Sequence, residues 1–148
     1  MEERFETFTV LINRISRNIR KIKNHEMAEY HLRSAHVSCL YYLYSSPGLT
    51  ATELSGRCEE DKATVSRALV YLKENGYLAD DEQQLNRYRA PLVLTEKGKE
   101  VGAKIAEKID RVLSGLNDSL SEDERLAFYC NLAAISARLD AVVDTYDE

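Results

Sequence analysis

Apolar positions recur at helical spacing near both ends of the chain. Between Glu3 and Met27, large apolar residues return every three or four positions, and a similar run follows Ser121. Each run predicts a long helix with a narrow apolar stripe, of the kind through which two helices pair. The N-terminal stripe consists of Phe5, Phe8, Ile12, Ile15, Ile19 and Ile22. The C-terminal stripe consists of Tyr129, Leu132, Ser136, Leu139, Val143 and Tyr146.

A buried helix is predicted after the first stripe. Ser34 is a suitable N-cap, and residues 35–45 are apolar on nearly every side of a helix. A helix without a polar face must be covered all round, so we expect it at the centre of the fold. The turn residues Ser46-Pro47-Gly48 would end it.

The next two helices have the proportions of a helix-turn-helix. Thr50 and Glu53 predict a capping box before a short helix over 51–57. Asp61 predicts the N-cap of a longer helix over 62–74. The turn between them is three or four residues long, as in DNA-binding helix-turn-helix motifs.

A hairpin is predicted directly after this pair. Residues 77–80 and 88–94 have the character of two strands around a polar tip at 81–87. In this position a hairpin is the wing of a winged helix. We therefore predict a mainly α single domain over 1–148, with a β-hairpin wing. Its parts would be a winged-helix core at 30–95 and helical dimerisation regions at 1–28 and 96–148.

The terminal helices predict a homodimer. A core of this size cannot cover both faces of three further helices, and an exposed apolar patch of such length usually marks an interface. Most homo-oligomers are two-fold dimers. Pairing of the two terminal helices within one chain is the alternative. The expected dimer contacts are Phe8, Ile12, Ile15, Ile19, Leu132, Leu139 and Val143.

The helix over 62–74 has two distinct faces. At 100° per residue, Val65, Leu69 and Leu72 fall on one side and Arg67 falls opposite them. Small side chains around an arginine suit the major groove, because the helix can approach closely and arginine can bind guanine bidentately. An ordinary amphipathic surface helix is the simpler alternative. The expected DNA contacts are Thr50, Lys62, Ala63, Thr64, Ser66, Arg67, Val70, Arg87 and Arg89.

The net charge of −5 does not exclude double-stranded DNA as a partner. Residues 1–120 hold 18 Lys and Arg against 18 Asp and Glu, whereas 121–148 hold 2 against 7. The acidic balance therefore belongs to the C-terminal segment. Basic residues between Arg14 and Lys23 lie off the N-terminal stripe. A solvated helix face is their simpler interpretation, and a phosphate contact is the alternative.

Four segments of the chain are informative together with the long first helix. They are Pro47-Gly48-Leu49-Thr50, Asp61-Lys-Ala-Thr-Val-Ser-Arg-Ala-Leu69, Asn75-Gly76-Tyr77-Leu78 and Leu94-Thr95-Glu96-Lys97-Gly98. With these segments the chain resembles the MarR family of bacterial winged-helix transcription regulators over nearly its whole length. The resemblance implies a homodimer held by the terminal helices, which binds a pseudo-palindromic operator and usually represses nearby genes. Many members of the family release DNA when a small molecule, an oxidant or a metal binds.

The chain departs from this family in its wing and in one turn. Asn86 and Tyr88 stand where an Asp–Arg pair is usual, so Arg87 becomes the first candidate for a phosphate or minor-groove contact and Arg89 the second. Glu59-Glu60 stand in the turn where glycine and an aliphatic residue are common. Two acids there favour a weaker or more selective DNA binder, or a winged-helix protein-interaction module without specific DNA binding.

An effector site is suggested by three tyrosines. In the family, ligands often lie between the dimer helices and the winged helix, and the helix over 35–45 would line that space. Tyrosine offers a large apolar face with a polar tip, which suits aromatic or amphipathic ligands. Plain core packing is the alternative. The candidates are Tyr41, Tyr42 and Tyr44.

The remaining chemistry predicts no enzyme, no metal and no cofactor. The sequence contains no HExxH, GxSxG, Walker A or GxGxxG motif. Cys39, Cys58 and Cys130 form no CxxC and are each expected to be small buried hydrophobic residues. His36 lies three residues before Cys39, with His31 nearby, but two adjacent ligands do not make a zinc site.

The composition predicts a cytoplasmic globular protein. The chain is 44% apolar and 30% charged, which is ordinary for that class. The charged N-terminus lacks the apolar stretch of a secretory signal. The longest apolar runs, such as Leu40–Tyr44, are far shorter than the roughly 20 residues of a bilayer span, so none is expected.

Overall fold

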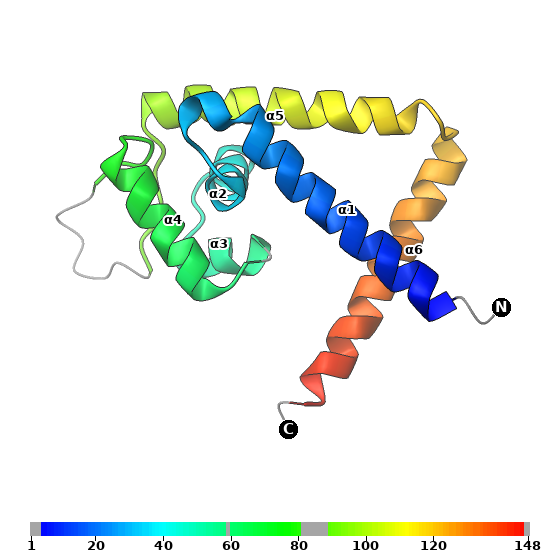
Figure 1. The fold of residues 1–148 in the computed structure, drawn as a ribbon. Coiled ribbons are helices and arrows are strands. Elements are labelled where there is room, and N and C mark those ends of the chain that lie inside the picture. Colours follow the sequence, from blue (N-terminus) through cyan, green and yellow to red (C-terminus); the bar gives the residue numbers. More distant parts are fainter. Residues whose placement is uncertain (1–3, 59, 81–88, 147–148) are drawn as a thin grey trace. The chain divides into compact units, whose positions relative to one another are not determined.

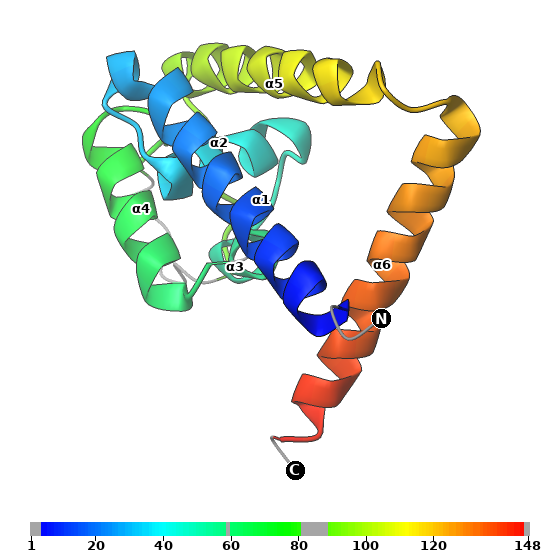
Figure 2. The same cartoon turned by 45° about the vertical axis from the view of Figure 1, so that its right-hand side comes forward.

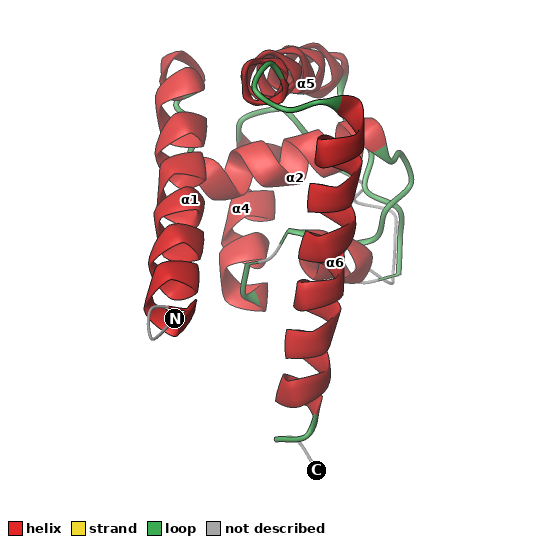
Figure 3. Cartoon of the chain, turned by 90° about the vertical axis from the view of Figure 1, so that its right-hand side faces the viewer, coloured by secondary structure: helices red, strands yellow, loops and turns green. Residues whose placement is uncertain are grey.

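The computed structural model describes residues 4–58, 60–80 and 89–146. Helices joined by loops make up these ranges (Figure 3). The helices are α1 (Arg4–Glu26), the 3-10 turn η1 (Ala28–Tyr30), α2 (Ser34–Ser45), α3 (Ala51–Arg57), α4 (Lys62–Glu74), α5 (Glu96–Asn117) and α6 (Glu122–Asp144). The mainly α class and the predicted order of helices are confirmed.

The chain divides into two compact units, Met1–Lys108 and Ile109–Glu148. The first unit holds the helix-turn-helix together with α1 and the first half of α5. The second holds the end of α5 and all of α6.

Helix α2 is the centre of the first unit, as its apolar pattern predicts. It packs against α1, α3 and α4, with α1 crossing it (Figures 1 and 2). Cys39 and Leu40 on α2 are completely buried, and Leu54 of α3 and Leu72 of α4 are equally inaccessible. Ile105 of α5 adds to the same core at 1% exposure. Helices α2, α3, α4 and α5 therefore contribute to a single hydrophobic core in this unit.

The N-terminus of α2 corrects the sequence-based assignment. Ser34 is the first residue of the helix, and the N-cap is Arg33. The amide of Ser34 donates to Asn24 Oδ1 at 2.7 Å, and the amide of Arg33 donates to His36 Nδ1 at 3.0 Å. Side chains of Asn24 and His36 therefore accept from the amides at the start of α2, and the cap lies one residue earlier than expected.

The other predicted helix starts are confirmed. The Thr50 hydroxyl accepts from the Glu53 amide, and the Glu53 carboxylate accepts from the Thr50 amide. Asp61 accepts from the amide of Thr64 at the start of α4. Ser121 caps α6 in the same reciprocal manner as Thr50 caps α3. Each cap lies within four residues of its partner, which is why sequence alone could place it.

The base of the predicted hairpin is present, but it is shorter than two full strands in the described residues. Leu78 and Leu94 form an antiparallel bridge, and the Ala79 amide donates to the Val93 carbonyl at 2.9 Å. The Leu92 amide donates to the Leu49 carbonyl at 2.8 Å, which ties this segment to the residue before Thr50. The predicted tip at 81–87, which includes Arg87, and residue 88 of the second predicted strand lie outside the described residues.

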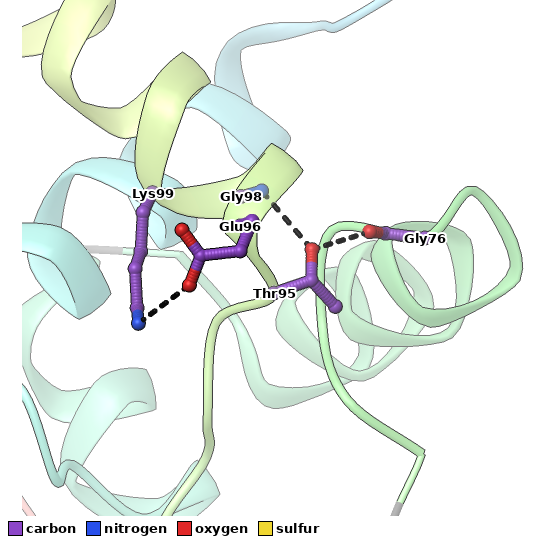
Figure 4. A network of polar contacts seen from close by, with 5 residues as sticks. All are labelled: Gly76, Thr95, Glu96, Gly98 and Lys99. Carbon is purple, nitrogen blue, oxygen red and sulfur yellow. Dashed lines mark hydrogen bonds and ion pairs between the residues drawn. The ribbon is translucent and has the colours of Figure 1, made fainter.

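Thr95 and Gly98 join the end of α4 to the start of α5 (Figure 4). The Thr95 hydroxyl donates to the Gly76 carbonyl at 2.5 Å and accepts from the Gly98 amide at 3.1 Å. A Cβ on Gly98 would lie 2.1 Å from the Tyr77 carbonyl oxygen. Glycine at this position therefore allows the backbone after α4 to meet the first turn of α5.

Helix α6 corrects the expectation drawn from short apolar runs. Over 23 residues it is long and apolar enough, by length and composition only, to cross a membrane. Alanines between the larger apolar residues make the helix apolar as a whole, although polar residues interrupt every apolar run. The helix also carries Arg138 and Asp140, and charges inside a bilayer are costly.

Candidate nucleic-acid interface

Helix α4 buries one face and exposes the other, as predicted. Val65 is 1% exposed, Leu69 8% and Leu72 0%. On the opposite side Arg67 is exposed and Val70 is 54% exposed. The buried stripe fixes the rotation of α4 about its own axis, so the sequence determines which side chains remain outside.

Contacts at the far end of α4 hold the helix in place. The Tyr71 hydroxyl donates to the His31 carbonyl at 2.9 Å, and the Tyr71 ring stacks on His36 with centroids 4.2 Å apart. Burial, and secondarily the neighbouring Arg33 charge, lower the pKa of His36. A neutral His36 can keep both its stacking contact and its hydrogen bond from the Arg33 amide.

The first turn of α4 carries a connected set of polar side chains. Asp61 Oδ2 accepts from the Thr64 hydroxyl at 2.7 Å, and Thr64 Oγ1 accepts from Arg67 Nη2 at 3.1 Å. Hydrogen bonds from the Thr64 side chain and amide lower the pKa of Asp61. Arg67 is thus restrained next to the helix N-terminus, where backbone amides favour anions.

The residues expected to contact DNA differ in exposure and in their place in the fold. Lys62, Ala63, Ser66, Arg67 and Val70 lie together on the exposed side of α4. Thr64 is half-buried beside them and takes part in the Asp61–Arg67 connection. Thr50 is half-buried at the start of α3, where its hydroxyl caps that helix. Arg89 is exposed in the segment that leads to Leu94.

The three tyrosines of the expected effector site all lie on α2, but they differ in burial and in what they contact. Tyr41 and Tyr42 are half-buried and meet edge to face, with centroids 5.3 Å apart. Tyr44 is 39% exposed and lies against α5, where a Cβ on Gly102 would be 2.8 Å from the Tyr44 Cβ. Tyr44 therefore has a packing role in addition to its expected ligand contact.

Cysteine placement was only partly predicted. Cys39 and Cys58 are buried as expected, but Cys130 on α6 is exposed, which corrects that expectation. The sulfurs of Cys39 and Cys58 lie 3.8 Å apart, although 19 residues separate them in the chain. Sequence spacing carries no sign of this pairing. In the described ranges, no three His, Cys, Asp or Glu side chains are grouped to hold a metal ion.

One basic residue of α1 does not belong to the solvated helix face that the sequence predicts. Lys23 is half-buried and its Nζ donates to Ser38 Oγ of α2 at 2.9 Å. Arg14, Arg17 and Lys21 are exposed, as a solvated face predicts. Lys23 is therefore part of the α1–α2 contact.

Both terminal stripes are exposed wherever the structure describes their side chains. Within the protomer, Phe8 and Ile12 are each 37% exposed and Ile15 is 51% exposed. On α6, Leu139 is 52% and Val143 54% exposed. Ile19 and Leu132, at 46% and 37%, complete the expected dimer set.

Known proteins give a consistent comparison. A model described as "MarR family" matches residues 32–84. The chain is 29% identical over 90 residues to an HTH-type transcriptional regulator of Bacillus subtilis strain 168, YybA, which is itself described as uncharacterized. That match covers 61% of this chain and 60% of the relative, so it spans less than two thirds of the relative's length.

Solved structures share the fold. A crystal structure of MarR is 28% identical, with a TM-score of 0.69 over 90% of this chain and 98% of that one. A crystal structure of a MepR–DNA complex from S. aureus is 21% identical, with a TM-score of 0.77 over 89% of this chain and 96% of that one. The second likeness, at its low identity, concerns the fold alone.

Proposed function

We propose that this chain, which the MarR family model matches over residues 32–84, is a DNA-binding transcriptional repressor of that family and binds a pseudo-palindromic operator as a homodimer. The exposed side of α4 carries this proposal: small side chains surround Arg67 opposite a fully buried stripe. The MepR–DNA complex, whose chain has the same fold, supports DNA as the ligand. A repressor of this kind needs neither catalytic residues nor a cofactor. We propose that it acts in the cytoplasm, where it has access to the chromosome.

Arg67 is the base-reading residue in this proposal. It lies on the exposed side of α4 in the N-terminal half, where a recognition helix meets base edges. The hydrogen bond from Arg67 to Thr64 restrains the side chain before DNA arrives, which reduces the entropy lost on binding. Lys62, Thr64 and Ser66 would contribute phosphate or base contacts beside it.

The wing supplies contacts of another kind. Arg87 belongs to the predicted polar tip of the hairpin and Arg89 follows it, and we assign both to phosphate or the minor groove. Such contacts add affinity for any sequence and release counterions, so they make binding depend on salt. Thr50 caps α3 through its hydroxyl, so its own contact to phosphate would be secondary.

The dimer accounts for the exposed stripes. A second copy of this chain would cover Ile15 and Leu139 together with their neighbours, and two recognition helices would then face the operator. Half-sites should lie about one helical turn, ~34 Å, apart. Cover by a second copy also explains why α6 can be as apolar as a membrane span without entering a bilayer.

A small aromatic or amphipathic effector is the regulatory part of the proposal. Tyr41, Tyr42 and Tyr44 would contact it on α2, next to α5. A ligand between these elements would change how the winged helix is held and would thereby release DNA. A panel of aromatic acids should raise the melting temperature and weaken operator binding. If no compound does either, these tyrosines serve only to pack the core.

The decisive experiment is a salt titration of binding to the chain's own upstream region and to random DNA. Arg67→Ala should cost about 1–3 kcal/mol per half-site on the operator and relax the preference at one base position. Arg87→Ala should weaken both DNAs alike and lower the salt slope by about one unit per contact. Arg17→Ala, on the exposed face of α1, is the control and should change neither.

Two results would contradict the proposal. If the wild-type protein binds neither DNA, the chain is a winged-helix protein-interaction module. The acidic sequences Glu59-Glu60 and Asp80-Asp81-Glu82 favour that alternative. If Arg67→Ala weakens both DNAs equally while Arg87→Ala affects only the operator, the roles of the two arginines are reversed.

A further inference from the structure

Two buried thiols from different helices meet in the core of the first unit. Cys39 lies in the middle of α2 and Cys58 is the C-cap of α3. Their sulfurs are 3.8 Å apart and both cysteines are free. Cys39 is 0% exposed, whereas Cys58 is 6% exposed. The pair therefore has a less accessible and a more accessible member.

A half-buried lysine contacts the residue next to one of the two cysteines. Lys23 of α1 donates to Ser38 Oγ, one residue before Cys39. Burial lowers the pKa of Lys23, while Glu60 and Cys58 attract its charge and act in the opposite direction. The hydrogen bond to Ser38 holds the Lys23 ammonium at the residue next to Cys39 in α2. Helix α1 contributes a cation to a site that α2 and α3 form.

The two thiols have unequal acidity. The hydrogen bond that Cys58 receives from Cys39 lowers the pKa of Cys58. Burial and the Glu60 charge oppose this shift, and the Lys23 charge favours it. The same hydrogen bond raises the pKa of Cys39, and burial raises it further. Cys58 is therefore the member that ionises first. A thiolate, and not a thiol, is the form that reacts with oxidants.

We propose that Cys39 and Cys58 are a modification site, at which hydrogen peroxide converts the two thiols into an intrachain disulfide. The Cys58 thiolate attacks one peroxide oxygen, an S–O bond forms, the O–O bond breaks, and the departing hydroxide becomes water with the proton that Cys58 lost. Cys39 then attacks the Cys58 sulfenic acid. The S–S bond forms, the S–O bond breaks, and the hydroxide leaves as water with the Cys39 proton.

The atoms balance and the movement is small. Two thiols are oxidised to one disulfide and one peroxide is reduced to two waters. A disulfide bond is about 2.05 Å long, so the sulfurs must approach by roughly 1.8 Å from their present separation of 3.8 Å. Cys58 can supply this movement because it ends a helix of only 7 residues.

The disulfide would alter the DNA-binding surface. This step rests on the proposed function. Cys58 comes directly before the turn that leads to Asp61 and α4, so drawing it toward α2 displaces the connection between α3 and α4. The oxidised protein should therefore bind its operator less tightly than the reduced protein, and a dithiol reductant should restore binding.

The test uses the full chain carrying Cys130→Ser, which removes the exposed third thiol. After peroxide treatment and alkylation, the intact mass should show the loss of two hydrogens and no alkyl group, and digestion should yield a peptide that links residues 39 and 58. Lys23→Met should slow the reaction, whereas Lys21→Met, an exposed neighbour on α1, should not. In Cys39→Ser, Cys58 should accumulate as a sulfenic acid that a dimedone-type probe traps.

The outcomes separate the two proposals. Alkylation of both thiols after peroxide treatment that fully oxidises Cys130 in the wild-type protein would overturn the disulfide, whatever the DNA result. A linked peptide with unchanged operator affinity would overturn the regulatory step. Absence of DNA binding by the reduced protein would count against the repressor alone, because the mass measurement does not involve DNA. Circular dichroism of each variant checks that it is folded.

Discussion

Helices α4 and α6 both present apolar side chains at helical spacing, but those of α4 are buried within the protomer and those of α6 are exposed. On α4 the apolar stripe is at most 8% exposed, because α2 packs against it. On α6 no residue is buried within the protomer, and Leu132, Leu139 and Val143 are 37% to 54% exposed. The comparison shows that a periodic pattern defines a face of a helix without identifying what covers it.

The two helices also differ in what lies opposite the apolar face. Arg67 and Ser66 make the outer side of α4 polar, so only one side of that helix requires cover. On α6 several alanines lie opposite the large side chains, and the helix is apolar enough for a membrane. We propose that α4 is stabilised by its own chain and α6 by a second copy. The following predictions test that difference.

The largest effect is expected when charge is placed in both terminal stripes. Ile15→Asp combined with Leu139→Asp would bury unpaired carboxylates in the proposed dimer interface, which is strongly unfavourable. Light scattering should find monomers or unfolded chain. The exposed pair Arg17→Asp and Glu122→Gln is a control that should remain dimeric. A stable dimer of the double aspartate variant would show that the stripes do not form the interface.

Replacing one large apolar side chain with alanine should have different effects on α4 and on α6. Leu72→Ala on α4 should cost about 2–5 kcal/mol of unfolding free energy, because it leaves a cavity at a fully buried site. Leu139→Ala should instead raise the dissociation constant of the dimer, measured by sedimentation, because this side chain is buried by association. If Leu139→Ala lowers the unfolding free energy and leaves the dissociation constant unchanged, Leu139 is buried within its own chain.

Two glycines of α5 allow a packed position and an open position to be compared within one helix. Gly98→Ala would press a Cβ against the Tyr77 carbonyl, at 2.1 Å, and should destabilise by about 1–3 kcal/mol as overpacking does. Gly115→Ala meets no atom within 4 Å and should stabilise by about 0.5–1 kcal/mol, because alanine favours helix. Chemical denaturation measures both. Equal effects of the same sign would contradict the close approach at Gly98.

The smallest effect concerns pH and His36. Its pKa is lowered in the folded protein from an ordinary value of 6.5, so the folded state binds fewer protons than the unfolded state below that pH. The stability that His36 contributes is therefore present above pH 6.5 and is lost as the pH falls through the lowered pKa. His36→Gln should flatten this part of the stability profile, whereas His25→Gln, on exposed α1, should leave it unchanged.

The sequence by itself determined the features that depend on near neighbours. The starts of α3, α4 and α6 follow from capping residues within four positions of their partners. The division of α4 into a buried and an exposed face follows from the 3.6-residue period. In each case the deciding residues lie close together in the sequence.

Only the tertiary structure decided which distant groups meet. The contact of Cys39 with Cys58 and the hydrogen bond from Tyr71 to the His31 carbonyl join residues 19 and 40 positions apart. Asn24, 10 residues before Ser34, takes the Ser34 amide and so shifts the cap that the local pattern favoured. Such pairings depend on how the chain closes its loops and packs its helices, and a single sequence carries no period that records them.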